Sequence, residues 1–131
     1  MIKHSLKEIN KILAALAETN RLRILMMLKT RPLAVCEIRE ILGLSFSTVS
    51  KHLSVLREAG LIDFEKDGKW VNYRFNQELP EVAREWLALL LEQISSDPQI
   101  QSDLEKIFVV DKFKICQKPD SEIDNYENKE E

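Results

Sequence analysis

The stretch SFSTVSKHLSVLREAGLI, residues 45–62, has the spacing of an amphipathic helix whose polar side begins without carboxylates. Val49, Leu53 and Leu56 recur at i, i+4 and i+7, which predicts one buried face. The other faces carry hydroxyls, a lysine and a histidine, and residues 46–54 contain no Asp or Glu. A helix that enters the major groove of DNA needs such short polar side chains to meet base edges and phosphates.

The residues on both sides of this helix predict a helix-turn-helix followed by a β-hairpin. A helix is expected over residues 33–42 with Gly43 as its C-cap, and Ser45 can cap the next helix through its hydroxyl. Two alternating segments, LIDFE and WVNYRF, surround Asp67-Gly68, a pair that favours positive φ in a hairpin turn. This order of elements is the winged-helix arrangement, a mostly α-helical fold with a small β-hairpin.

Helices are also expected before and after this unit. Apolar residues repeat at helical spacing over residues 6–16, and residues 19–20, Thr-Asn, offer a cap for the helix that Arg-Pro ends at residues 31–32. The segment PEVAREWLALLLEQI, residues 80–94, has an apolar surface wider than one small core would bury. That breadth predicts a subunit-pairing helix, with burial in a single core as the alternative. Its candidate contact residues are Val82, Trp86, Leu89 and Leu90.

The chain divides into three parts. Residues 1–94 are expected to form the winged-helix and dimerisation domain, residues 95–116 a C-terminal helical extension that begins at Asp97-Pro98, and residues 117–131 an acidic, disordered tail. Residues 1–76 contain 13 Lys and Arg against 8 Asp and Glu, a net charge of +5, whereas residues 77–131 contain 6 against 14, a net charge of −8. This asymmetry is typical of a basic binding module joined to an acidic remainder, although a solvated acidic tail alone would also give it.

Composition excludes several classes of protein. The longest apolar run, WLALLL, is far shorter than the roughly 20 residues that a membrane span needs. The first ten residues lack the apolar core of a signal peptide, so a cytoplasmic protein is expected. The two cysteines imply no disulfide framework and are expected to be free thiols. No glycine-rich phosphate loop, catalytic carboxylate pair or Ser-His-Asp arrangement supports an enzyme.

The candidate contacts with double-stranded DNA lie on the helix of residues 45–62 and on the hairpin, or wing, after it. Hydroxyls can donate to phosphates or to either base type, and lysine adds charge attraction. His52 is either a base-edge or phosphate contact or a bystander. Wing cations can contact phosphate or the minor groove. The full set is Ser45, Ser47, Thr48, Ser50, Lys51, His52, Ser54, Lys66, Lys69 and Arg74.

Over residues 9–92 the chain resembles the arsenic-repressor (ArsR/SmtB) family of metal-sensing repressors. The most specific pieces are LAETNRLRIL, STVSKHLSVLREAGLI and GKWVNYRF. The resemblance implies a homodimeric winged helix that sits on a palindromic operator and leaves it when an inducer binds. It also implies dimerisation through the first helix, at Ile9, Leu13 and Leu16, together with the helix of Trp86.

The inducer site is where the chain departs from the family pattern. Members that sense trivalent arsenic or soft metals often carry Cys-Val-Cys before the recognition helix, and here the matching residues are Ala34-Val35-Cys36. Members that sense zinc or nickel use histidines on the dimer helix, and residues 79–94 contain none. Cys36 and Cys116 are therefore the candidate ligands for trivalent arsenic or another soft ion, with no required cofactor.

Several alternatives stay open. Cys36 can be a small apolar residue without a sensing role, or the two cysteines can form a redox switch, or no inducer exists. A different class of function is a protein-interaction winged helix in which the acidic half docks a partner. Salt dependence separates the last class from DNA binding, because contacts with phosphates weaken steeply as ionic strength rises.

Overall fold

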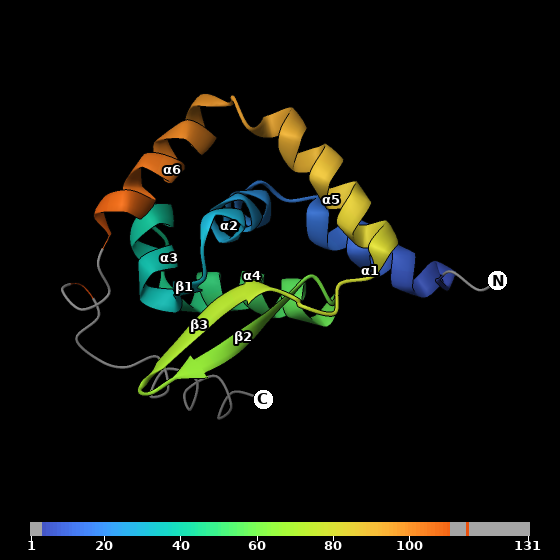
Figure 1. The fold of residues 1–131 in the computed structure, drawn as a ribbon, viewed down its shortest axis with the longest axis horizontal. Helices are drawn as coiled ribbons and strands as arrows, with labels where there is room; N and C mark the ends of the chain where they lie inside the picture. The colour runs from blue at the N-terminus through green and yellow to red at the C-terminus, as the bar shows by residue number, and fades with distance from the viewer. Residues whose placement is uncertain (1–3, 111–114, 116–131) are drawn as a thin grey trace.

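The computed structural model describes residues 4–110 and residue 115. Its elements follow in the order α1 (Leu6–Leu16), α2 (Thr19–Thr30), β1 (Leu33–Ala34), α3 (Val35–Leu42), α4 (Phe46–Glu58), β2 (Ile62–Asp67), β3 (Trp70–Phe75), α5 (Glu81–Ile94) and α6 (Pro98–Val109). The hairpin and α4 lie on one side of α2, and α5 and α6 arch over its other side (Figure 1). Among the described residues, no helix is long and apolar enough to cross a membrane. The predicted helix-turn-helix with a wing is confirmed.

The sheet has one more strand than the sequence predicts. Residues 33–34 form β1 and pair with β3, Leu33 opposite Tyr73, so the strand order is β1-β3-β2. The expectation that these two residues open the third helix is wrong, because that helix begins at Val35. The Glu37 carboxylate accepts a hydrogen bond from the backbone N–H of Ala34 at 2.9 Å, which caps α3 at this corner.

Helix α2 is the centre of the core. Its residues 24–28 are all buried, because α1, α4, α5, α6 and β3 pack around it. A helix enclosed on every side needs no polar face over its middle turns. Its N-cap is Glu18, whose carboxylate accepts from the Arg21 N–H at 2.8 Å, and not Thr19-Asn20 as the sequence predicts.

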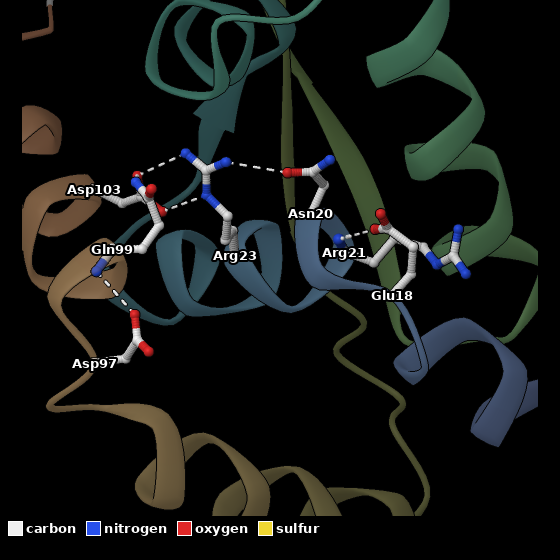
Figure 2. Close-up of polar contacts among 7 residues, drawn as sticks. All are labelled: Glu18, Asn20, Arg21, Arg23, Asp97, Gln99 and Asp103. Carbon is white, nitrogen blue, oxygen red and sulfur yellow. Dashed lines mark hydrogen bonds and ion pairs between the residues drawn. The ribbon is translucent and has the colours of Figure 1, made fainter.

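Helix α6 is fastened to α2 by a buried ion pair. The Arg23 guanidinium donates to both carboxylate oxygens of Asp103, at 2.8 and 2.9 Å, and Asp103 is 0% exposed (Figure 2). Gln99 also donates to Asp103, and Asn20 accepts from Arg23. The hydrogen bond to Asp103 raises the pKa of Arg23. The sequence-predicted start of α6 is confirmed, since Asp97 caps it and proline opens it.

Arg31, the residue after α2, bridges α3 and α6 through an ion pair with α3 and a hydrogen bond to α6. The Arg31 guanidinium donates to the buried Glu37 carboxylate at 2.9 Å and to the carbonyl of Ile107 at 3.2 Å. Together the two pairs make α6 part of the body that carries α3. The predicted disordered tail, residues 117–131, lies outside the described residues.

The apolar surface predicted for the pairing helix remains after the chain folds. Helix α5 buries Ala83, Leu87 and Leu91 against its own core, whereas Leu89 is 64% exposed. On α1, Leu13 is likewise 51% exposed. The remaining predicted dimerisation residues, Ile9, Leu16, Val82, Trp86 and Leu90, are partly buried. Their role between subunits stays a prediction.

Candidate nucleic-acid interface

Hydroxyl groups gather at the start of α4. The Ser45 hydroxyl accepts a hydrogen bond from the backbone N–H of Thr48 and donates one to the Thr48 hydroxyl at 2.9 Å. The Ser47 hydroxyl lies 3.3 Å from the Ser45 hydroxyl. All three side chains are exposed, and Lys51 is exposed one turn further on. The predicted cap is confirmed, and this end of α4 presents donors and one positive charge to solvent. Ser54, further along the helix, is partly buried.

Ser50 does not belong to this exposed face. It is 8% exposed, and its hydroxyl has no hydrogen-bond partner among the described residues. The expectation that it lies on an outer face is wrong, because Ser50 follows Phe46 by one helical turn and both residues are on the flank of α4 that packs toward α3. A direct DNA contact from this hydroxyl is therefore not expected.

Replacing Ser50 with alanine tests this placement. A buried hydroxyl without a partner costs desolvation energy, so Ser50→Ala should stabilise the fold by about 1 kcal/mol. Urea unfolding measures that change, and fluorescence anisotropy on duplex DNA should show an unchanged affinity. Weaker DNA binding by a variant of unchanged stability would return Ser50 to the set of contact residues.

His52 faces α2 rather than open solvent. Its side chain is 14% exposed, its Nδ1 lies 3.3 Å from Nη1 of Arg21, and the Glu18 carboxylate is 3.8 Å away. Since a guanidinium only donates, this hydrogen bond requires a lone pair on Nδ1 and places the ring proton on Nε2. Arg21 also donates to the carbonyls of Ala14 and Ala15 at the end of α1. The histidine therefore joins α4 to the α1–α2 corner, and of its ring nitrogens Nε2 is the one that could contact DNA.

The wing turns one residue later than predicted. Asp67 pairs with Trp70, so the two-residue loop is Gly68-Lys69 and not Asp67-Gly68. Gly68 has a φ of +61°. Type II′ turns need a positive φ at the first loop position, and glycine is the residue preferred there. Lys66 and Lys69 are exposed near this tip, where the prediction places phosphate contacts.

Two carboxylates of β2 compensate the charge of Arg74. Its Nε donates to Asp63 at 2.9 Å, and its Nη1 donates to Glu65. The hydrogen bond to Asp63 raises the pKa of Arg74. The predicted role of Arg74 as a DNA contact would require it to exchange these partners for a phosphate.

Two arginines beside α4 were missed in the sequence. Arg39 of α3 lies over the ring of Phe46, 5.9 Å from its centroid, and Arg57 in the last turn of α4 lies 4.7 Å from the centroid of Phe64. Phe46, the first residue of α4, therefore contacts α3. In each case the sequence places an arginine seven residues before a phenylalanine of the next element. The three-dimensional fold is needed to show that the two side chains meet.

Of the two cysteines, the described residues include only Cys36. Cys36 lies in the first turn of α3 and is partly buried, next to the buried Val35, as the helical geometry predicts. It is disulfide-bonded, so the expected free thiol is not observed. Cys116 lies outside the described residues. Within the described ranges, no three His, Cys, Asp or Glu side chains are grouped to hold a metal ion.

Known proteins share this architecture and sequence. The family described as "Bacterial regulatory protein, arsR family" matches residues 18–63. The arsenic resistance transcriptional regulator ArsR1 of Pseudomonas putida is 34% identical over 103 residues, which cover 67% of this chain and 80% of that regulator. The chain belongs to the ArsR family. This membership makes α4 and its wing parts of a DNA-binding transcriptional regulator.

Further relatives agree with this assignment. The arsenical resistance operon repressor of Escherichia coli is 37% identical over 79 residues, 60% of this chain and 64% of that repressor. The homodimeric winged helix-turn-helix DNA-binding domain of Mb0332 from Mycobacterium bovis, described as a possible ArsR-family regulator, has a TM-score of 0.59 and 30% identity. That likeness covers 77% of this chain and 94% of the solved domain.

Proposed function

We propose that this ArsR-family protein is a homodimeric repressor that a thiol-binding metalloid or soft metal, such as trivalent arsenic, releases from its operator. The observation that carries the DNA-binding part is the exposed face of α4, where hydroxyls and Lys51 occur without carboxylates over residues 46–54. The relatives named for arsenic resistance support the choice of inducer.

Exposed apolar side chains support the dimer. Leu13 on α1 and Leu89 on α5 are more than half exposed in the single chain. Burying them against a second copy would remove apolar area from water, which is favourable by about 25 cal/mol per Å². The homodimeric Mb0332 domain has the same architecture. A symmetric pair would also present two copies of α4, as a palindromic operator requires.

The position of Cys36 suggests how an inducer could act. Cys36 is in the first turn of α3, and α3 packs directly against α4. A ligand bonded to this sulfur could favour a dimer geometry with low DNA affinity, which is a population shift. Two thiolates per chain suffice for a monomethylated arsenical. Inorganic trivalent arsenic, which usually binds three thiolates, would need a further thiolate from the second subunit.

Thiol oxidation is the second candidate signal. The disulfide-bonded state of Cys36 supports it, because a disulfide and its thiols interconvert with the redox state of the surroundings. In this version the reduced and oxidised proteins, and not the free and metalloid-bound ones, would differ in operator affinity.

The experiment is fluorescence anisotropy of the reduced protein on duplex DNA from upstream of its own coding sequence. Phenylarsine oxide or arsenite should weaken binding about 10- to 100-fold, the range of a coupling of roughly 1–3 kcal/mol. Cys36→Ser should bind the same DNA as tightly as the unmodified protein and ignore the arsenical. A diamide arm tests oxidation in the same assay.

The outcomes separate the alternatives. Release by arsenicals that persists in Cys36→Ser would remove this cysteine from the sensor. Release by diamide alone would replace the metalloid with oxidation. No DNA binding at 50 mM salt would favour the protein-interaction class.

A further inference from the structure

We infer that Arg39 and Arg57 are phosphate-binding side chains that hold one strand of the duplex along a flank of α4. This inference rests on the proposed DNA binding and adds the residues that fix the protein on the DNA backbone. Neither arginine belongs to the face of α4 that the sequence indicates.

The other arginines of the described ranges already have partners within the protein. Each of them donates to a carboxylate, a backbone carbonyl or a histidine within the protein: Arg21, Arg23, Arg31, Arg74 and Arg84. The side chains of Arg39 and Arg57 make no hydrogen bond or ion pair within residues 4–110, and the Nε of Arg39 is buried without a partner. Their charges are therefore available to an external anion.

Each of the two guanidiniums lies over an aromatic ring. Arg39 lies over Phe46, and Arg57 lies over Phe64. A ring contact of this kind uses the flat face of the guanidinium and leaves its terminal Nη–H donors open to bind a phosphate. The ring also holds the side chain in place before binding, which lowers the entropy lost when the phosphate is bound.

The two arginine–aromatic stacks lie near opposite ends of α4. Phe46 is the first residue of α4, and Arg57 follows it by eleven residues. At 100° and 1.5 Å per residue, that spacing corresponds to about 20° around the axis and about 16 Å along it. Phe46, which carries the Arg39 stack, and Arg57 therefore leave α4 on the same side, one near each end. In helix-turn-helix proteins the helix before the recognition helix crosses the DNA backbone. Here that helix is α3, and it carries Arg39.

Nearby carboxylates do not cancel these charges. Glu40 and Glu58 directly follow the two arginines in sequence and are exposed, but neither forms an ion pair with them. The wing shows the opposite arrangement, since Asp63 and Glu65 hold Arg74. The fold thus neutralises one arginine beside the predicted interface and leaves two others unpaired.

The test is a salt titration of DNA binding by the Arg39→Ala and Arg57→Ala variants. Each lost phosphate contact should reduce the slope of log K against log salt by about 0.9, or about 1.8 for a dimer that loses one contact per subunit. The probe is a 30-base-pair duplex of arbitrary sequence as well as the upstream DNA, because phosphate contacts are independent of sequence. Both duplexes should show the same reduction.

Lys106→Ala is the matched control, since it removes one exposed charge from α6, on the other side of α2. Its slope should equal that of the unmodified protein. Arg39→Lys and Arg57→Lys keep the charge, so they should restore most of the slope, and thermal unfolding followed by circular dichroism checks the fold of each variant. Folded alanine variants with the slope of the unmodified protein would overturn the inference. An unmodified protein that fails to bind either duplex would overturn the proposed DNA binding itself, and this inference with it.

Discussion

Asp103→Ala should destabilise the folded chain by about 3–5 kcal/mol, because it leaves the Arg23 guanidinium largely buried without its counter-charge. Four hydrogen bonds meet at this pair, two between Arg23 and Asp103, one from Gln99 and one to Asn20. A domain of this kind has a total stability of about 5–15 kcal/mol, so the loss would be a large part of it. Urea unfolding followed by circular dichroism measures the difference.

Two variants make this prediction specific. Asp97→Ala removes an exposed carboxylate from the same helix, six residues away, and should cost only about 1 kcal/mol as the loss of an N-cap. The double change Arg23→Met with Asp103→Leu removes both charges and should recover most of the loss, because a buried pair replaced by apolar side chains is often close to neutral. If Asp103→Ala costs no more than Asp97→Ala, the buried pair does not hold α6 to α2.

What the sequence predicts correctly depends on near neighbours in the chain. The Gly43 C-cap, the Ser45 N-cap and the Asp97-Pro98 helix start each involve a few consecutive residues, and all three are confirmed. The buried face of α4 follows from a repeat within one helix and is confirmed for the same reason. Physical rules about caps and periodicity act over one or two turns, so a single sequence contains enough information to apply them.

The wrong expectations depend on distant partners. Placing the hairpin loop at Asp67-Gly68 instead of Gly68-Lys69 shifts every cross-strand partner by two residues, which hides the pairing of Asp63 with Arg74. Strand β1 exists only because β3 returns beside it, about 40 residues later. Ser50 is buried although its position in the helical repeat of α4 predicts an outer face, because α3 packs against this helix.

In the candidate interface, too, features within one helix could be predicted and contacts between elements could not. Exposure of Ser47, Thr48 and Lys51 could be predicted from the pattern of one helix, and the structure agrees. The aromatic stacks of Arg39 and Arg57 could not, because each joins two elements. A count of positive charges along the sequence does not show which of them the fold neutralises.

Lys51→Glu should reduce affinity for the upstream DNA by about a hundredfold at 100 mM salt. The change removes a cation from the exposed face of α4 and places a carboxylate where residues 46–54 have none. A like charge against phosphate costs several kcal/mol, of which roughly 2.8 kcal/mol corresponds to two powers of ten. Since a dimer carries two copies of α4, both half-sites would be affected.

Lys106→Glu is the control that isolates position from net charge. It makes the same change in charge on an exposed side chain of α6, which lies across α2 from α4. Its affinity should fall less than threefold, because screening at 100 mM salt limits charge effects to about 10 Å. Fluorescence anisotropy measures both variants, and urea unfolding should show that both remain within about 0.5 kcal/mol of the unmodified protein, as expected for surface substitutions. If the two variants lose affinity equally, the exposed face of α4 would not be the surface that meets DNA, and the general charge of the molecule would explain binding instead.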